Sequence, residues 1–525
     1  ESDIRPDLVF GNKDRTGVYF DPDNNFFYLT PEVAEGSGPL RLPTVDSRTG
    51  KIINETARLV GNADGYFTPE RVHGRVTGNN VASWRPSSGD WYETVKLNYG
   101  FDFLNRERAP DYPSAISPRK RIPDTWKKMD AIITYWQEMG VDGFRVDMAH
   151  MVPPEFWKWM IHRAQSRAPD VFFFAEAYDN DPAKVPSRDP AIREDDSVML
   201  ALLDAGFNAV YDDPGYDTLE HLTAGERWAN DLDAVESGLG AFFFDCAVRY
   251  AENHDEIRLA HPETWGAQGM EVGRPVSATL FGLSRGPVMV YHGQEVGEPG
   301  LGREGFGGDD QRTSIFDYWS LPELNKWWNH GAADGARLSQ AQGELRAWYV
   351  RLMHLLGEPA FASGVFVPLN AANQANPYFG KVADVGPSGH WLHAYVRSDR
   401  RNDSSYLVTS NFHPTATLRH VRVRLPDAAV VALGLTETAD EWLVLKDQLA
   451  LDGQPVRAIR VSEALREGIY LDQLAPLAAY YWEIQTEDSL SEDMQVSAGV
   501  AAGQAFLGAP PVSRVRGGES LSLDL

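Results

Sequence analysis

Hydrophobic residues change their spacing twice along the chain, and these changes divide it into three main regions. Up to about residue 97 helical periodicity is weak, and turn-forming Gly, Asn, Asp, Pro and Ser are dense. We expect a loop-rich region there, with short strands at Gly17–Phe20 and Phe26–Leu29. Helical and strand-like patterns then alternate, and after about residue 360 strand-like patterns separated by turns predominate.

The middle region predicts a parallel sheet with helical crossovers. A helical stripe from Asp124 to Met139 precedes the apolar segment Gly143–Val146, which we expect to be a buried strand, and a second helix is expected from Glu155 to about Ala168. This alternation is typical of a (β/α) barrel, whose active site lies at the carboxyl ends of its strands. The other elements expected here are the strands Val171–Ala175, Asn208–Tyr211, Val248–Ala251 and Pro287–Tyr291 and helices near Val276–Leu283 and Glu344–Leu356.

The last region predicts an antiparallel β-sandwich. Trp391–Arg397, Tyr406–Phe412 and Leu418–Leu425 alternate between apolar and polar residues, and the pattern ends near Ile484. The remaining tail is rich in Ser, Gly, Ala and acidic residues, and we expect it to be poorly ordered. The predicted domains are a loop-rich insertion at 1–97, a barrel at 98–360, a β-sandwich at 361–485 and the tail at 486–525.

Three of the expected strands end in a carboxylate: Asp147, Glu176 and Asp255. A single acid at such a position is most often a helix cap or one half of a surface ion pair. Three acids on strands of one barrel converge on one mouth, where neighbouring charges force their pKa values apart. Glycoside hydrolysis by two carboxylates requires one ionised and one protonated group. Arg145 lies two residues before Asp147, so it points to the same side of the strand and can hold that carboxylate ionised.

The motifs around these residues resemble the signatures of the α-amylase family of glycoside hydrolases and transglycosidases. Gly143–Asp147 is similar to the family's second signature, Phe174–Ala177 to its third and Asn253–Asp255 to its fourth. Gly286–Glu295 resembles the segment at the eighth barrel strand, and Arg312–Trp319 the loop that follows it. Each motif alone is moderately specific, whereas all of them in this order are very specific. The resemblance covers about residues 1–485.

The resemblance implies a retaining mechanism on α-1,4-glucosidic bonds. Asp147 would be the nucleophile, Glu176 the general acid/base, and Asp255 the carboxylate that grips ring hydroxyls and stabilises the transition state. The expected substrate-binding residues are Arg145, which would orient the nucleophile, His254, which would hydrogen-bond the sugar in the first subsite, and Tyr291. No cofactor is needed for this chemistry, and a structural calcium ion is compatible with it.

Two departures from the family pattern matter. His150 follows the expected nucleophile by three residues, where relatives have Lys-His directly after it. It is a weak candidate for the histidine that supplies a backbone carbonyl to calcium, and an ordinary polar residue is an equal alternative. The family's first signature is missing, because the only Asn-His-Asp is the fourth signature. The expected fold is therefore an α/β TIM barrel, (β/α)8, that lacks its first three strands, with the inserted domain before it and the β-sandwich after it.

Other candidate sites are weaker. Trp84, Trp91 and Tyr92 could stack on sugars, although structural packing is favoured. Turns such as Asp21–Asn25 and Asn79–Asn80 could bind calcium, yet such turns are more often plain turns. The Gly-rich stretch Gly305–Gly308 has no Lys-Ser/Thr after it and is no phosphate cradle.

The composition limits the kinds of partner that the chain can bind. Lys and Arg number 49 and Asp and Glu 75, which gives a net charge of −26. Such a surface repels phosphate backbones and anionic lipids, so we expect an α-glucan substrate and neither nucleic acid nor a membrane as partner. One cysteine, Cys246, excludes an internal disulfide. Oligomeric state and localisation, cytoplasmic or exported, stay open.

Three hypotheses follow for the function. The leading one is a hydrolase that cuts α-1,4 bonds of starch, glycogen or maltodextrins through a covalent glycosyl-enzyme intermediate. The second is an α-glucan transglycosidase of the same family, which passes the glycosyl group to another sugar or to phosphate. The third is a non-catalytic glucan-binding remnant, which the missing signature favours and the three intact carboxylates oppose. The signatures alone do not separate the first two, because the choice between hydrolysis and transfer depends on acceptor subsites and on water exclusion by loops.

Overall fold

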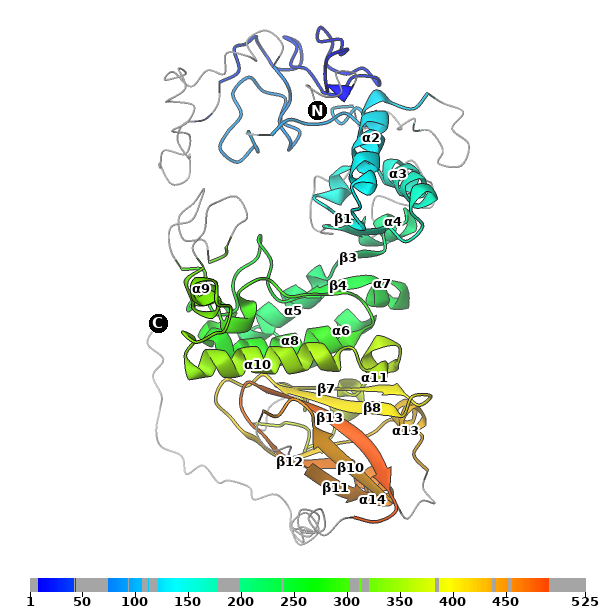
Figure 1. Ribbon diagram of the computed structural model, residues 1–525, viewed down its shortest axis with the longest axis vertical. Coiled ribbons are helices and arrows are strands. Elements are labelled where there is room, and N and C mark those ends of the chain that lie inside the picture. Colours follow the sequence, from blue (N-terminus) through cyan, green and yellow to red (C-terminus); the bar gives the residue numbers. More distant parts are fainter. Residues whose placement is uncertain are drawn as a thin grey trace. The chain divides into compact units, whose positions relative to one another are not determined.

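A computed structural model describes residues 8–41, 43, 74–92, 94–105, 112, 121–177, 198–237, 240–301, 311–313, 321–382, 387–436, 441–451 and 456–490 (Figure 1). The chain forms two compact units, Glu1–Leu345 and Arg346–Leu525, with the boundary inside helix α10 (Gln340–Leu355). The predicted domain boundaries at 97, 360 and 485 stay predictions. Within the described ranges no helix is long and apolar enough to cross a membrane.

The first unit is built on a five-stranded sheet with the order β1-β2-β3-β4-β5, and every pair in it is parallel. The strands begin and end within two residues of the bounds that the hydrophobic runs predicted. They are β1 (Gly143–Val146), β2 (Phe172–Ala175), β3 (Ala209–Tyr211), β4 (Ala247–Tyr250) and β5 (Val288–Met289). A partial (β/α) barrel followed by antiparallel sheets confirms the predicted fold class.

Helices connect these strands. Pro153 precedes α3, and a proline at its first position, Pro154, suits a helix start because that N–H has no partner within the helix. The helices of this unit are α2 (Asp124–Glu138), α3 (Pro154–Arg167), α4 (Val198–Asp204), α5 (Asp213–Thr223), α6 (Leu232–Ser237), α7 (Gly240–Cys246), α8 (Gly273–Leu283) and α9 (Pro322–Trp328). Short 3₁₀ turns occur at Ala149–Met151, Ala229–Asp231, Trp265–Ala267, Gly269–Val272, Gln294–Val296 and Asn329–Gly331.

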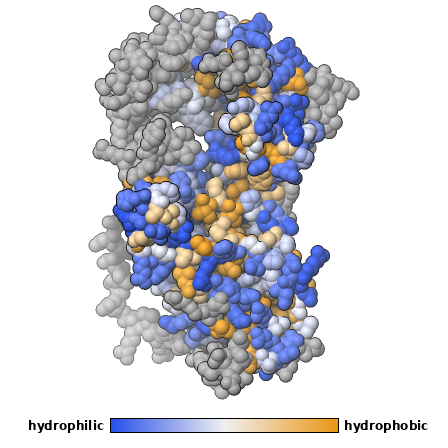
Figure 2. Space-filling model, in the orientation of Figure 1, coloured by the Kyte–Doolittle hydropathy of each residue, from blue (hydrophilic) through white to orange (hydrophobic). Residues whose placement is uncertain are grey.

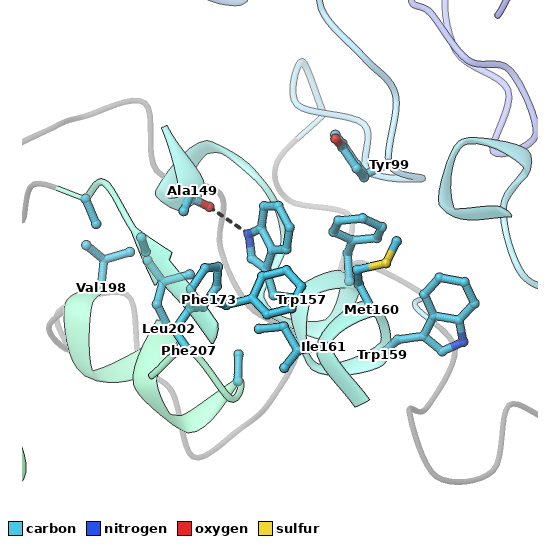
Figure 3. Close-up of a cluster of buried hydrophobic side chains, with 14 of the residues drawn as sticks. Tyr99, Ala149, Trp157, Trp159, Met160, Ile161, Phe173, Val198, Leu202 and Phe207 are labelled. Atoms are coloured by element: carbon cyan, nitrogen blue, oxygen red, sulfur yellow. Dashed lines mark hydrogen bonds between the residues drawn. The ribbon is translucent and has the colours of Figure 1, made fainter. Parts of the chain in front are cut away.

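One core cluster runs from the N-terminal loops to the back of β1 and β2. Figure 3 shows its centre, where Trp157 and Ile161 of α3 lie beside Phe173 of β2 and Leu202 of α4. Aromatic rings in this cluster pack edge to face, a geometry that the ring quadrupole favours. This packing fixes α3 against the sheet and, through it, the turn that follows β1.

Two details of the first unit differ from expectation. The predicted strands Gly17–Phe20 and Phe26–Leu29 are wrong: the structure has only isolated bridges there, such as Phe26 with Leu97. At the start of the second segment the Asp14 carboxylate accepts hydrogen bonds from the backbone N–H groups of Asn25 and Phe26, so the Phe26 donor does not serve a strand ladder. In addition, the four residues of β1 are half-buried and not buried, since β1 lies at one edge of the described sheet.

The second unit contains a six-stranded sheet with the order β11-β10-β13-β8-β7-β6 and a two-stranded sheet of β12 and β9, all antiparallel. Leucine, isoleucine and valine side chains from both sheets form its core. Its strands are β6 (Val365–Pro368), β7 (Leu392–Asp399), β8 (Ser404–Asn411), β9 (Leu418–Val423), β10 (Trp442–Asp447), β11 (Val456–Arg460), β12 (Ile469–Leu474) and β13 (Ala478–Glu487); its short helices are α11 (Pro359–Ala362), α12 (Asn370–Asn373), α13 (Asp427–Leu433) and α14 (Val461–Glu467).

The surface is mixed in character. On the face in view in Figure 2, hydrophobic residues gather in the middle and hydrophilic residues predominate around them. The tail predicted to be poorly ordered lies outside the described residues from position 491 onward.

Candidate active site

Asp147 and Glu176 occupy equivalent positions on neighbouring strands. In the parallel register Val146 of β1 is opposite Ala175 of β2, so each carboxylate is the first residue after its strand. The Glu176 N–H donates to the Val146 carbonyl at 2.9 Å, which extends the pairing by one step. The sequence therefore places both acids at the same edge of the sheet, as predicted.

The turn after Asp147 is shaped around Glu176. Met148 adopts a left-handed conformation (φ 46°), and its N–H donates to Glu176 Oε2 at 2.8 Å. The Ala149 N–H donates to the Glu176 carbonyl at 3.0 Å, and the Ala149 carbonyl accepts from Trp157 Nε1 at 3.0 Å, the dashed line in Figure 3. The aromatic core thus holds the backbone that holds the Glu176 carboxylate.

Arg145 joins the two acids. One terminal nitrogen lies 3.1 Å from Asp147 Oδ2 and the other 2.9 Å from Glu176 Oε2, so a single guanidinium contacts both carboxylates. Its charged end also lies 5.9 Å from the centre of the buried Tyr211 ring, at the end of β3. Burial works against the charge, yet the Tyr211 hydroxyl and the two carboxylates together raise the pKa of Arg145 above its ordinary value.

The two carboxylates have different environments. The Asp147 side chain is 69% exposed and the Glu176 side chain 4%. Burial, together with the nearby charges of Asp147 and Asp255, raises the pKa of Glu176 to about 7, and the Met148 N–H and Arg145 offset only part of this effect. A carboxyl group with a pKa near neutrality can give and take a proton at physiological pH.

Asp255 lies after β4, beside His254 and Arg312. His254 Nε2 is 2.9 Å from Asp255 Oδ2, and an Arg312 terminal nitrogen donates to the Asp255 carbonyl at 3.2 Å and lies 3.9 Å from Oδ1. Burial favours the neutral acid, but the His254 hydrogen bond and charge, with those of the two arginines, lower the pKa of Asp255 below its usual value. Glu176 and Asp255 are close enough for their charges to interact, and their pKa values move apart.

Tyr291 lies after β5, where its ring stacks under a guanidinium. Its hydroxyl donates to the Thr313 carbonyl at 2.6 Å, and the Arg258 guanidinium lies 4.3 Å from its ring centre. Tyr291 therefore ties the end of β5 to the loop around Thr313, which Arg312 also belongs to.

Arg258, like Tyr211, is a residue that the sequence did not single out. It is fully buried, pairs with Glu252 Oε2 at 2.7 Å, donates to the His292 carbonyl at 3.1 Å and to Thr313 Oγ1 at 3.0 Å. It thus links the ends of β4 and β5 with the loop around Thr313. Its three partners lie 6 to 55 residues away in the chain, and no local motif marks it.

In the described part of the chain, none of the candidate metal sites has a set of metal ligands. His150 is buried in the 3₁₀ turn Ala149–Met151, and in the described ranges no three His, Cys, Asp or Glu side chains come together as a metal cluster. At the turn Asp21–Asn25, a lysine ammonium occupies an oxygen-lined position: Lys128 Nζ lies 2.7 Å from Asn25 Oδ1 and 2.8 Å each from Asp124 Oδ2 and the Val9 carbonyl.

The aromatic candidates of the N-terminal region have separate environments. Trp84 is buried and its Nε1 donates to the Gly36 carbonyl at 3.1 Å, which is structural packing. Tyr92 is buried as well, whereas Trp91 is 43% exposed. The Gly305–Gly308 stretch lies outside the described residues.

Residues 119–331 match the family model described as "Alpha amylase, catalytic domain". Asp147, Glu176, Asp255 and Tyr291 all fall inside that segment. The chain is 45% identical over 60 residues to an alpha-1,4-glucan:maltose-1-phosphate maltosyltransferase of Cereibacter sphaeroides, covering 11% of this chain and 10% of the relative. It is 26% identical over 317 residues to an alpha-amylase of Streptomyces lividans, covering 55% of this chain and 30% of the relative.

The chain therefore spans between about a tenth and a third of the length of these curated relatives. Among solved structures, an alpha-amylase of Anoxybacillus is similar at 16% identity, with a TM-score of 0.46 and coverage of 74% of this chain and 70% of that one. The family match supports a glycosidase-type enzyme.

Proposed function

Because residues 119–331 belong to the alpha-amylase family of glycosidases and transglycosidases, we propose that this chain is a retaining glycosidase that cleaves α-1,4-glucosidic bonds. The substrates are starch, glycogen or maltodextrins. The observation that carries the proposal is the Arg145 guanidinium in contact with Asp147 and Glu176 at the ends of adjacent parallel strands.

The first half-reaction uses the difference between the two carboxyl groups. Exposed Asp147 attacks the anomeric carbon, and Glu176 gives its proton to the glycosidic oxygen as that bond breaks. An ester between Asp147 and the sugar results, and the shortened glucan leaves with the proton of Glu176. Arg145, 3.1 Å from Asp147 Oδ2, holds the nucleophilic carboxylate in place.

The second half-reaction returns both groups to their starting states. Glu176, now ionised, takes a proton from water, and the water oxygen attacks the anomeric carbon and releases Asp147. Asp255, kept ionised by His254 and Arg312, holds ring hydroxyls and stabilises the positive charge that develops on the sugar. The proposed substrate-binding roles of His254 and Tyr291 complete the site, and no cofactor takes part.

A transglycosidase is the second candidate, supported by the similarity to relatives named maltosyltransferases. The same ester would then be released to a hydroxyl or phosphate oxygen in place of water. Products analysed with and without an acceptor sugar distinguish the two: transfer yields longer or phosphorylated products, hydrolysis only shorter ones.

The test is reducing-sugar release from soluble starch by this chain and by Asp147→Asn and Glu176→Gln. Each substitution removes an obligatory group, so we expect a loss of about 10³-fold or more. Asp204→Asn is the matched control, because that carboxylate is exposed on α4 and pairs only with Lys158 at 3.2 Å among its recorded contacts. If the wild-type chain binds glucan but neither hydrolyses nor transfers it, also when extended upstream, the catalytic proposal fails and a glucan-binding role replaces it.

The pH profile gives an independent check. Glu176 must be protonated to act as the acid, and its pKa of about 7 means that the protonated fraction falls as pH rises through neutrality. We therefore expect kcat/KM to drop about tenfold per pH unit above pH 7. Leaving groups that need no proton, such as aryl glycosides of acidic phenols, should lose this alkaline limb. An alkaline limb that persists with such substrates would contradict the assignment of Glu176.

A further inference from the structure

An open cavity of about 290 Å³ lies in the second unit, far along the chain from the candidate active site. Strands of both sheets line it: Arg457 of β11, Gln473 of β12, and Tyr480 and Trp482 of β13. Thr417, before β9, and Ala475, after β12, complete the lining. The cavity therefore opens where the two-stranded sheet meets the six-stranded one.

The floor of the cavity is aromatic. Tyr480 and Trp482 alternate along β13, so their rings point to the same face of the sheet, where they stack at 5.2 Å with an angle of 10°. Trp482 is fully buried and its Nε1 donates to Thr409 Oγ1 at 3.1 Å, so it supports Tyr480 from below. Tyr480 is only partly buried and is the ring that a ligand meets.

Polar groups of complementary kinds surround that ring. The Tyr480 hydroxyl accepts from the Ala475 N–H at 3.0 Å, and burial raises its pKa, so it keeps a proton to donate. The exposed Gln473 uses its Oε1 to accept from Arg419 at 3.1 Å, which leaves its amide N–H groups for a ligand. Thr417 adds a hydroxyl, which can both donate and accept.

We propose that this cavity, which belongs to the other unit than the proposed catalytic carboxylates, is a second carbohydrate site that binds one or two glucosyl units of an α-glucan. A pyranose has an apolar face that suits an aromatic ring and a rim of hydroxyls that suits Gln473 and Thr417. The volume lies at the lower end of the range of about 300–1,000 Å³ typical of small-molecule sites, which suits one or two rings and not a long segment.

The charges around the cavity favour a neutral ligand. Arg457 lies 5.9 Å from the Trp482 ring centre and donates to the Val456 and Leu471 carbonyls, which occupies part of its guanidinium. The Asp447 charge also acts on Tyr480, opposite in sign to Arg457. Together with the net charge of −26, this disfavours an anion. The choice of glucan rests on the proposed function.

The test measures protection of the cavity directly in the full chain. Maltoheptaose is added to the Glu176→Gln variant, which does not consume it, and amide hydrogen exchange is followed by mass spectrometry. We expect slower exchange at residues 469–482. Gln473→Ala and Tyr480→Ala should each raise, at least fivefold, the maltoheptaose concentration that gives half of this protection. Tyr378→Ala, which replaces an exposed tyrosine outside the cavity, should leave that concentration unchanged.

Each outcome separates this inference from the proposed function. Unchanged exchange at 469–482 in a chain that cleaves starch overturns the second site and leaves the catalytic proposal intact. Protection that depends on Gln473 in a chain without activity supports the site while the catalytic proposal fails. Because Gln473 is exposed, its replacement does not threaten folding. Inorganic phosphate protecting the same segment as well as maltoheptaose does would overturn the assignment to a neutral sugar.

Discussion

Both units bury charged groups and neutral amides, but the buried charges have different partners. In the first unit two buried arginines are paired with buried acids: Arg249 with Asp212 at 2.5 Å and Arg258 with Glu252 at 2.7 Å. In the second unit, buried Arg397 donates to the backbone carbonyls of Ala360 and Phe361. In the second unit, fully buried neutral amides bond to backbone groups of neighbouring loops and strands. These are Asn370, Asn373, Asn376 and Asn411.

The difference shows what each unit uses its polar groups for. An amide satisfies backbone carbonyls and N–H groups without any dependence on pH, and it costs less to bury than an ion. Buried ions cost several kcal/mol of desolvation each and lose their compensation when one partner is removed. The first unit accepts this cost at and just after β4, the strand that also precedes Asp255.

Removing one buried charge should break the first unit. Arg258→Met keeps an apolar side chain of similar length but leaves Glu252 buried without its cation, so we expect local destabilisation of about 3–5 kcal/mol. Hydrogen exchange at residues 247–259 measures it. Arg312→Met is the control, because Arg312 is 38% exposed and its removal should cost under about 1 kcal/mol. Equal losses of stability in both variants would show that the buried Arg258–Glu252 pair stabilises the unit no more than the exposed Arg312 does.

The regularity of the apolar spacing explains which parts of the fold could be predicted from the sequence. The strands β1 to β5 and the helices α2, α3 and α10 were predicted within a few residues because their apolar periodicity is regular. Short helices such as α4, α6 and α7 were missed, since six or seven residues show too few turns for a period to appear. The strand expected at Phe26–Leu29 was wrong: Asp14 takes the N–H groups of Asn25 and Phe26, and the remaining backbone bonds of the segment form only isolated bridges.

The candidate site was predictable to the same extent. The carboxyl ends of parallel strands meet at one edge, so the neighbouring positions of Asp147 and Glu176 followed from the strand pattern. Tyr211 also ends a predicted strand, and that position was a usable signal that was overlooked. Arg258 was not predictable, because its partners come from three segments that only the folded chain brings together.

Asp447 is a charged group in the second unit. Replacing it tests whether the stability of this unit depends on a buried charge. Burial raises its pKa from 3.8 to about 6, against the effect of two backbone N–H groups. Both donors, of Leu449 and Tyr481, bond to the same oxygen, Oδ1, which Asn can supply equally well. A raised carboxyl pKa stabilises the folded state fully below pH 3.8, and this contribution is lost as pH rises through about 6.

We therefore expect Asp447→Asn to match the wild type at about pH 4 and to gain stability as pH rises, by at most roughly 3 kcal/mol at pH 7. Thermal unfolding of the unit, followed by circular dichroism at pH 4, 5.5 and 7, gives the pH dependence. A loss of stability at pH 7 would mean that the attraction of Arg351 outweighs burial. The second unit would then depend on charge as the first one does.

The smallest effect is expected at a single neutral amide of the second unit. Asn370 follows the end of β6 and continues its pairing with a side chain: Nδ2 donates to the Leu392 carbonyl and Oδ1 accepts from the Ala394 N–H, both at 2.9 Å. Asn370→Ala leaves these two groups of β7 without that partner in a buried place, which costs about 1–3 kcal/mol. The cost should be the same at pH 5 and pH 8, because no group titrates. Asn402→Ala, at an exposed turn beside Asp399, should change stability by no more than about 0.5 kcal/mol. If the stability cost of Asn370→Ala depended strongly on pH, it would contradict the expectation that buried neutral amides contribute to stability independently of pH.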